Sequence, residues 1–159
     1  MGQLEIRKAI LADVPAVRGL IKDHAAEDLL LPRTLSYLYE NVRDFFVACL
    51  EGQVIGCASL HVMWSDLAEV KSVAVTPEHK GQGYGRRLVE ACLEEARQLG
   101  VAKVFVLTLV PAFFERLGFQ PLDKDELPRK IWGECIHCPR FPDCDEVALA
   151  VETGPGTEA

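Results

Sequence analysis

Three glycines alternate with larger residues in the middle of the chain, at positions 81, 83 and 85. They follow an apolar run that ends before Pro77 and lead into a run with helical periodicity, which starts near residue 84 and includes the third glycine. Glycine lets the backbone take positive φ and approach a ligand closely. A helix start adds unpaired N–H groups and a partial positive charge. Together these features predict an anion-binding loop, with phosphate as the favoured anion.

Other interpretations of this loop are weaker. A tight turn without a ligand remains compatible with the spacing alone. A Walker loop would end in Gly-Lys-Ser/Thr, whereas Gly85 is followed by Arg86 and Arg87. A dinucleotide-binding loop would have the order G-x-G-x-x-G near the start of the chain, and this order is not found here.

A second group of chemically capable residues lies near the end of the chain. Cys135, His137, Cys138 and Cys144 could supply a tetrahedral Zn²⁺ site. His137 directly precedes Cys138, which is an awkward geometry for two ligands of one ion. We therefore favour free thiols, or a disulfide formed during handling, and expect no metal in catalysis. The remaining cysteines are expected to be small buried apolar residues: Cys49, Cys57 and Cys92. The histidines outside this group, at positions 24, 61 and 79, show no partner pattern and are expected at the surface or at an edge.

The elements that must position these residues follow from periodicity and turn signals. The amphipathic helix over residues 84–99 is the strongest prediction, with Gly100 ending it. Asp13 is expected to cap a helix over residues 15–24, and Thr34 a short helix after it. Strands are expected at residues 5–9, 45–50, 54–63, 68–76, 103–109 and 146–151, with a short helix at 111–117. This order predicts an α/β fold: one mixed sheet with helices on both faces.

Composition limits the possible functions. The chain has 159 residues, 49% of them apolar, and a net charge of −7. That length suits one domain, which we expect over residues 1–151, followed by a disordered tail at 152–159. The negative charge argues against binding to nucleic acid or to an anionic membrane. No bilayer-spanning run or signal-peptide pattern is found, so a cytoplasmic protein is expected.

The glycine segment resembles the pyrophosphate loop of the GCN5-related N-acetyltransferase (GNAT) superfamily. That loop has the pattern Gln/Arg-x-x-Gly-x-Gly/Ala, which is matched here from Lys80 to Gly85 with Lys in first place. The strand at 73–75 and the helix at 113–119 also occur in the superfamily's order. The resemblance implies acetyl-CoA as co-substrate, and a sheet that splays between its fourth and fifth strands to admit the pantetheine arm. The implied cofactor-binding residues are Val73, Ala74, Val75, Lys80, Gly81, Gln82, Gly83, Tyr84, Gly85, Arg86 and Phe114.

The resemblance also implies roles at the reacting amine. Glu69 is the candidate general base, because it lies on the same strand as Val73, four residues upstream, and hence on the same face. The N–H near Val73 could stabilise the oxyanion. Many relatives use a late-helix Tyr to protonate the leaving thiolate, and here that position holds Phe114. A thiol with a pKa of about 8.5 can leave without that acid.

A narrower resemblance concerns the acceptor. Residues 30–34, 68–75, 104–108, 113–119 and 126–132 look like the acetyltransferase domain of N-acetylglutamate synthase, in its short stand-alone form. This implies L-glutamate as the small-molecule partner, a place at the start of arginine biosynthesis, and a possible homodimer. An amino-dicarboxylate needs cationic clamps. The implied substrate-binding residues are Arg33, Lys71, Ser72, Thr108, Arg129 and Lys130. Another small amine, such as glutamine, a polyamine or a protein N-terminus, and a non-catalytic acetyl-CoA-binding module remain the alternatives.

Overall fold

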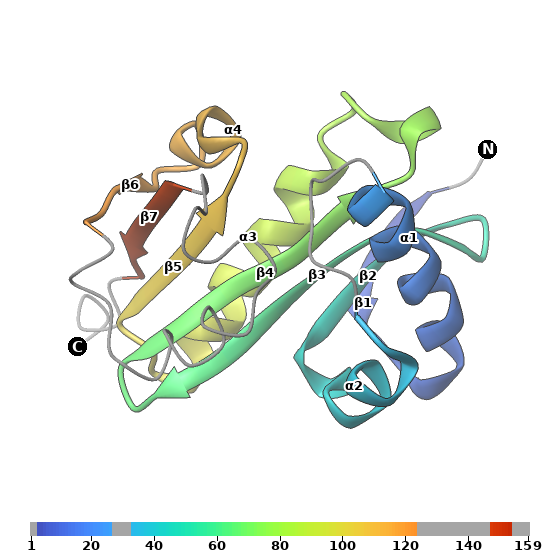
Figure 1. Ribbon diagram of the computed structural model, residues 1–159, viewed down its shortest axis with the longest axis horizontal. Helices are drawn as coiled ribbons and strands as arrows, with labels where there is room; N and C mark the ends of the chain where they lie inside the picture. The colour runs from blue at the N-terminus through green and yellow to red at the C-terminus, as the bar shows by residue number, and fades with distance from the viewer. Residues whose placement is uncertain (1–2, 27–32, 124–146, 154–159) are drawn as a thin grey trace. The chain divides into compact units, whose positions relative to one another are not determined.

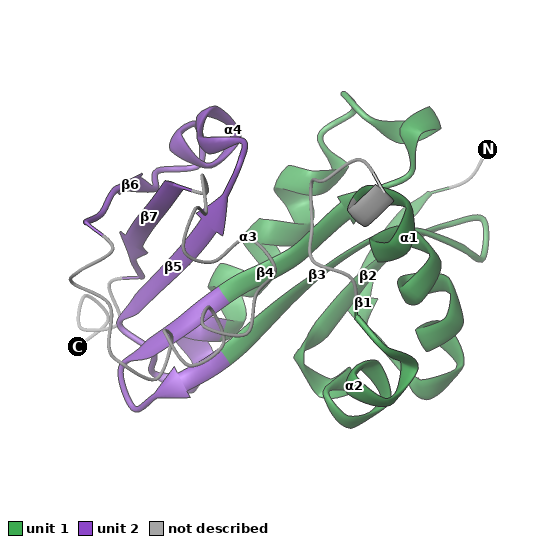
Figure 2. Cartoon of the chain, in the orientation of Figure 1, with its two compact units in different colours: residues 1–61, 70–95 green, residues 62–69, 96–159 purple. Residues whose placement is uncertain are grey.

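The computed structural model describes residues 3–26, 33–123 and 147–153. Its strands form a seven-stranded mixed sheet in the order β1-β2-β3-β4-β5-β7-β6, with flanking helices (Figure 1). The mixed α/β architecture predicted from the sequence is therefore confirmed. Residues 3–26, 33–61 and 70–95 form one compact unit, and residues 62–69, 96–123 and 147–153 form a second (Figure 2).

The first unit contains an antiparallel meander. β1 (Leu4–Lys8) pairs with β2 (Phe45–Leu50), and β2 pairs with β3 (Gln53–Trp64). β2 and β3 are joined by a two-residue turn in which Glu51 (φ 53°) and Gly52 (φ 80°) both have positive φ. Positive φ at both central residues defines a type I′ turn, which matches the twist of the flanking strands.

Two helices cover one face of this meander. α1 (Val14–Ala26) and α2 (Leu35–Glu40) pack on apolar side chains of β2 and β3 in one core cluster. As predicted, Thr34 caps α2: its hydroxyl accepts a hydrogen bond from the Tyr37 N–H at 3.0 Å. A single turn of 3₁₀ helix (Val42–Asp44) then leads into β2.

Asp13 has a different role from the predicted helix cap. It lies in a 3₁₀ turn (Leu11–Asp13) before α1, and its carboxylate accepts the Ile10 N–H at 2.8 Å. The same carboxylate forms a two-pronged ion pair with Arg7 of β1, with N–O distances of 2.8 and 3.1 Å. The sequence pattern predicted only contact of Asp13 with the local backbone. It did not predict the ion pair with Arg7, because that residue lies on a neighbouring strand.

α3 (Tyr84–Leu99) covers the other face of the meander, and its predicted apolar stripe is buried from Leu88 to Ala96. Leu99, the last residue of the helix, is exposed. The helix ends at Gly100 (φ 86°), where the Val101 N–H bonds the Ala96 carbonyl at 2.9 Å. This bond is the long-range one of a Schellman motif, so the predicted glycine stop is confirmed.

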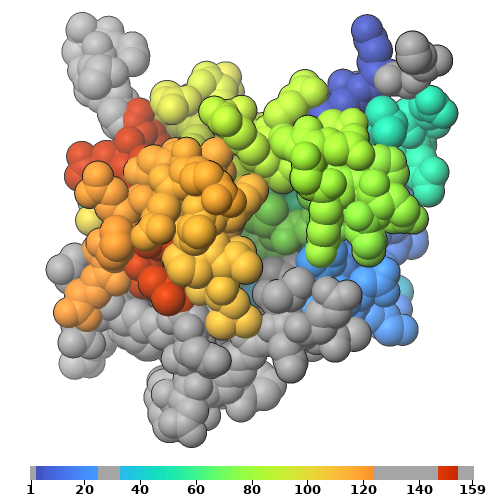
Figure 3. Space-filling view, turned by 90° about the horizontal axis from the view of Figure 1, so that it is seen from above, coloured from blue at the N-terminus to red at the C-terminus, as the bar shows by residue number. Residues whose placement is uncertain are grey.

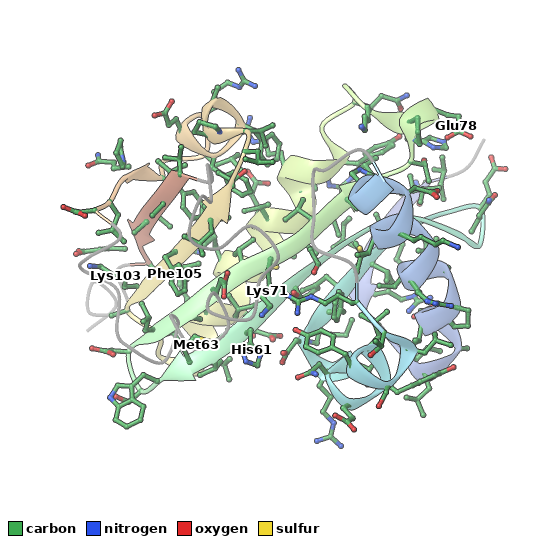
Figure 4. All side chains as sticks on the ribbon, viewed as in Figure 1. His61, Met63, Lys71, Glu78, Lys103 and Phe105 are labelled. Carbon is green, nitrogen blue, oxygen red and sulfur yellow. The ribbon has the colours of Figure 1, made fainter. Side chains whose placement is uncertain are left out.

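The second unit is built around β5 (Lys103–Thr108). β4 (Leu67–Val75) pairs with it in parallel through Leu67, Ala68 and Glu69, and the pairing ends at Glu69↔Phe105. β7 (Val147–Glu152) pairs antiparallel with all six residues of β5, and β6 (Gln120–Pro121) pairs with β7. Met63 packs against the core around Phe105 (Figure 4). α4 (Pro111–Glu115) follows β5, so this unit presents the end of a strand and the start of a helix together.

The end of the described chain is fastened inside the second unit. The Thr153 N–H bonds the Ala102 carbonyl at 2.9 Å, and its hydroxyl bonds the Val101 carbonyl. The last strand therefore extends one residue beyond the predicted 146–151, and the next residue is anchored. Among the described residues, no helix has both the length and the apolar character needed to cross a membrane.

Candidate active site

β4 is interrupted at Ser72, which has a φ of 58° within the strand and is buried. A side chain larger than glycine in the left-handed region costs about 1–2 kcal/mol, so neighbouring groups must hold it there. Two side chains of β3 bond the carbonyls on this stretch. The Ser59 hydroxyl donates to the Lys71 carbonyl at 2.9 Å, and the Cys57 thiol donates to the Ser72 carbonyl at 3.3 Å.

This interruption changes which face each side chain of β4 takes. In an unbroken strand, residues three apart lie on opposite faces. Yet Lys71 reaches the Tyr37 ring of α2, and Ala74 belongs to the core that α1 and α2 cover. Both therefore lie on the helix α1/α2 face, which requires one extra residue between them, a β-bulge. The expectation that Glu69 and Val73 share a face does not hold, because alternation resets at Ser72.

Two cationic side chains gather on one aromatic ring in the first unit. The guanidinium carbon of Arg33 lies 4.5 Å from the Tyr37 ring centroid, and the Lys71 ammonium lies 5.9 Å from it. Arg33 Nε is buried. A cation within about 6 Å of an aromatic face is attracted to it. Arg33 and Lys71, both predicted from the sequence as substrate-binding residues, are thus brought together.

Tyr37 was missed by the sequence reasoning. It lies three residues after the helix cap Thr34 and four after Arg33, a spacing that puts Arg33 and Tyr37 on the same side of the helix start. That spacing was the available signal. Lys71 could not have been added to it from the sequence, because its face depends on the bulge at Ser72.

The three described histidines all have hydrogen-bond partners, and burial of His24 contradicts the expectation that all three lie at the surface or at an edge. His61 Nδ1 lies 2.7 Å from Asp44 Oδ2, and His24 Nδ1 lies 2.9 Å from the Leu20 carbonyl oxygen. His24 is also buried. His61 and Lys71 come from the neighbouring strands β3 and β4 (Figure 4). The partner of His79 is Thr76, just before the glycine loop.

The glycine loop has the backbone that an anion site requires. Gly81 and Gly83 have φ of 80° and 84°, and a Cβ added at either would meet no atom within 4 Å. The first turn-forming bond of α3 runs from the Arg87 N–H to the Gly83 carbonyl at 3.1 Å. The amides of residues 84–86 therefore precede the first helical donor, the Arg87 N–H, and are the N–H groups that a helix start can offer to a ligand. The loop and its flanks lie at the surface (Figure 3).

Side chains around the loop fix its two ends. At the start, Thr76 Oγ1 lies 2.7 Å from His79 Nδ1, and the His79 ring faces Tyr84 at a centroid distance of 6.2 Å. At the helix start, exposed Arg86 pairs with Glu90 at 3.0 Å. An exposed pair of this kind contributes little to stability, so Arg86 can exchange Glu90 for another anion at small cost. Lys80 and Gln82 are exposed.

Three predicted site residues lie in the second unit. Glu69 is only 7% exposed, at the last position where β4 pairs with β5. Thr108 is buried at the end of β5, where its hydroxyl oxygen accepts the Val110 N–H at 2.9 Å. The Phe114 ring is buried edge-to-face against Phe113 and Phe119, with centroid distances of 4.9 and 5.4 Å. No proton donor is possible at residue 114.

Several predicted residues cannot be placed. Arg129 and Lys130, and the cluster of Cys135, Cys138 and Cys144, lie outside the described residues. Within the residues that the structure describes, no three His, Cys, Asp or Glu side chains gather as a metal site would require. The other cysteines, Cys49, Cys57 and Cys92, are buried free thiols, as predicted.

The left-handed bend in β4, the open glycine loop before α3 and the cationic cluster on Tyr37 all lie in the first unit. A family model described as the acetyltransferase (GNAT) family matches residues 16–119. The chain belongs to this family. The family's fold therefore accounts for the order of strand, glycine loop and helix from residue 67 to residue 99.

Individual relatives of this GNAT protein are similar over most of its length. An uncharacterised N-acetyltransferase of Chlorobaculum tepidum is 42% identical over 144 residues, which cover 91% of this chain and 93% of the relative. A Mycobacterium tuberculosis protein named amino-acid acetyltransferase is 41% identical over 132 residues, covering 81% and 75%.

Solved structures extend the comparison. Rv2747 of Mycobacterium tuberculosis, in complex with CoA, has a TM-score of 0.80 and 34% identity, covering 93% of this chain and 98% of that one. N-acetylglutamate synthase of Neisseria gonorrhoeae, complexed with coenzyme A and N-acetyl-glutamate, has a TM-score of 0.87 and 28% identity. It is matched over 96% of this chain but only 36% of its own.

Proposed function

We propose that this protein transfers the acetyl group of acetyl-CoA to the α-amine of L-glutamate. The observation that carries the proposal is the pair of cations on Tyr37, since an amino-dicarboxylate has two carboxylates to be neutralised. The relative named amino-acid acetyltransferase and the neighbour complexed with N-acetyl-glutamate support an amino-acid acceptor. Arg33 and Lys71 would bind the acceptor carboxylates, with Arg129, Lys130, Ser72 and Thr108 as further predicted contacts.

The glycine loop would hold the diphosphate of acetyl-CoA. Its residues fit that group: the loop is exposed, the space beside Gly81 and Gly83 is open, and amides precede the first helical bond. Lys80 and Arg86 would add positive charge beside the main-chain donors from Gln82 to Gly85. Main-chain groups of Val73, Ala74 and Val75 would pair with the pantetheine arm as an added strand does. Phe114 would contribute an apolar surface.

Acetyl-CoA supplies the acetyl group as an activated thioester. Glu69 would take a proton from the attacking ammonium, directly or through water, because only the neutral amine can attack the thioester. As the C–N bond forms, the N–H at Val73 would bind the oxyanion. The C–S bond then breaks and CoA leaves as thiolate, since Phe114 has no proton to offer, and the second proton of the acetylated nitrogen passes to this thiolate or to water.

A panel of amines with measurement of CoA release tests the proposal. Glutamate-dependent release, with N-acetyl-L-glutamate identified by mass spectrometry, is the expected result. Faster CoA release with glutamine, a polyamine or a peptide N-terminus would identify that amine as the acceptor in place of glutamate. Tight CoA binding without turnover on any amine would show that the protein is a non-catalytic CoA-binding module and would contradict the enzymatic assignment.

The biological setting follows from the same proposal. A glutamate acetyltransferase makes the acetylated amino acid with which arginine biosynthesis begins, and such a role suits a cytoplasmic protein. Association as a homodimer belongs to the proposal as well, and sedimentation of the purified protein measures it directly.

A further inference from the structure

The left-handed residue in β4 has no local reason to adopt its conformation. Glycine, asparagine and aspartate are the residues that adopt the left-handed region readily. Residue 72 is instead a serine within a strand, and it is followed by Val73. Its conformation must therefore be imposed by groups that contact the bulge from elsewhere in the fold. Those contacts come from β3.

Two buried donors of β3 bond the two carbonyls that flank the Ser72 N–H and α-carbon. Ser59 is 2% exposed and donates to the Lys71 carbonyl, while fully buried Cys57 donates to the Ser72 carbonyl. Residues 57 and 59 are two apart on one strand and so lie on the same face. Burial raises the pKa of the Cys57 thiol to about 12, and a backbone hydrogen bond from Ala74 opposes that rise in part. The thiol thus keeps its proton and can donate it.

We infer that Cys57 and Ser59 are positioning residues for catalysis: they hold the bulge at Ser72, and thereby the directions of Lys71 before it and of the Val73 backbone after it. The catalytic part of this inference rests on the proposed function, because Lys71 is there an acceptor ligand and the Val73 N–H an oxyanion donor. Neither Cys57 nor Ser59 would touch the substrate, and both act through main-chain carbonyls of β4.

The faces that Lys71 and Ala74 take give the physical reason why the donors Cys57 and Ser59 matter. Lys71 reaches Tyr37 only if the strand carries one extra residue before Ala74, which is packed in the α1/α2 core. If the bulge relaxed to an unbroken strand, Lys71 or Ala74 would have to change face. Carbonyls taken out of a ladder need other donors when they are buried. Ser59 and Cys57 donate to the two carbonyls at this bulge, so removing both side-chain donors removes these two hydrogen bonds.

The test uses the full chain with Cys57→Ala, Ser59→Ala and the double variant. Cys57→Ser keeps a donor at the same place and serves as the conservative variant. Cys92→Ala is the matched control, because Cys92 is a buried thiol of α3, on the other face of the sheet. Three quantities are measured: kcat with glutamate, the thermal midpoint, and the ¹³Cα and ¹³Cβ shifts of Ser72, which report its backbone conformation.

We expect the double variant to lose at least ~tenfold in kcat, since a small misplacement of reacting groups is costly, and to shift the Ser72 signals. Cys57→Ser should keep kcat and the Ser72 signals near their wild-type values. Cys92→Ala should lower the thermal midpoint without changing kcat or the Ser72 signals. Unchanged Ser72 signals in the double variant would overturn the claim that these donors hold the bulge. Shifted signals with unchanged kcat would overturn the positioning role. If the wild-type protein acetylates no amine, the proposed function and this catalytic role fall together, and the Ser72 signals still decide the holding role alone.

Discussion

Glu69 combines burial with a position beside the parallel ladder of β4 and β5. If it is the general base, the Glu69→Gln variant keeps the shape of the side chain and loses the proton acceptor. We expect kcat to fall by about 10²-fold or more, while the KM for acetyl-CoA stays within a factor of about two. Steady-state CoA release measures both constants. Glu115→Gln, at an exposed residue of α4, is the matched control, and an unchanged kcat in Glu69→Gln would remove Glu69 as the base.

Removing the Arg33 side chain should weaken binding of the acceptor, glutamate, and not binding of the acetyl donor, acetyl-CoA. Losing a charged hydrogen-bond donor to a carboxylate costs about 1.5–3 kcal/mol, so Arg33→Ala should raise the KM for glutamate by about 10- to 100-fold. The KM for acetyl-CoA should change little. Exposed Arg18 of α1 provides the control, as Arg18→Ala. Equal damage to both KM values would indicate misfolding rather than a lost contact.

The Tyr37 ring should act through the two cations it holds. Tyr37→Phe preserves the ring and its attraction for Arg33 and Lys71, whereas Tyr37→Leu removes it. We expect Tyr37→Leu to raise the KM for glutamate several-fold and Tyr37→Phe to leave it near the wild-type value. A large effect of Tyr37→Phe alone would show that the hydroxyl, and not the ring, contributes.

At the scale of elements, the glycine loop can be tested against a turn with the same backbone. Gly81 and Gly52 both have a φ of 80° and open space where a Cβ would be added. Alanine at either position should therefore cost a similar 1–2 kcal/mol or so of folding free energy. Only Gly81→Ala should weaken CoA binding, measured by calorimetry at matched temperature. Equal CoA affinities in the two variants would argue against the loop as the diphosphate site.

The junction of β1 and α1 depends on the ion pair between Arg7 and Asp13. The Arg7 guanidinium holds the pKa of Asp13 below its usual value. A lowered native pKa stabilises the fold above the unfolded value of about 3.9, and this contribution is lost as pH falls through the lower native pKa. Asp13→Asn should reduce the free energy of unfolding by about 1–3 kcal/mol at pH 7.

Urea unfolding at several pH values tests this junction. The stability difference between wild type and Asp13→Asn should shrink below about pH 4, where Asp13 begins to protonate in the unfolded chain. Asp23→Asn on the exposed side of α1 is the control and should show no comparable difference. A difference independent of pH would contradict an ionic origin.

At the scale of the whole molecule, the three buried thiols report how the first unit opens. Burial raises the pKa values of Cys49, Cys57 and Cys92 above the ordinary thiol value, so little reactive thiolate is present at neutral pH. We expect alkylation to modify them only when the unit unfolds. Pulse labelling with mass spectrometry should give equal rates if opening is cooperative, and clearly separate rates would show local opening instead.

Much of the architecture could be predicted because its signals are local. The periodic apolar stripe of α3, the Thr34 cap, the Gly100 stop and the alternation of strands and turns all depend on residues close in sequence. The glycine loop was found for the same reason, since its positive φ values occur at glycines.

The missed features depend on contacts between distant segments. Ser72 carries no sequence signal for a left-handed conformation, because Cys57 and Ser59 on another strand hold it. Tyr37 gains Lys71 as its second cation only when β4 is bulged. Asp13 and His61 likewise find partners six and seventeen residues away, beyond the reach of pattern reasoning.

The turn between β2 and β3 offers a route to a more heat-resistant protein. Glu51 is exposed and adopts a left-handed conformation that asparagine takes with less strain, and Gly52 already suits the second position. Glu51→Asn would complete the Asn-Gly pair that this hairpin geometry favours, with an expected gain of about 0.5 kcal/mol. Such a variant would provide a sturdier background in which damaging substitutions at Glu69, Arg33 or Ser59 could be purified and compared.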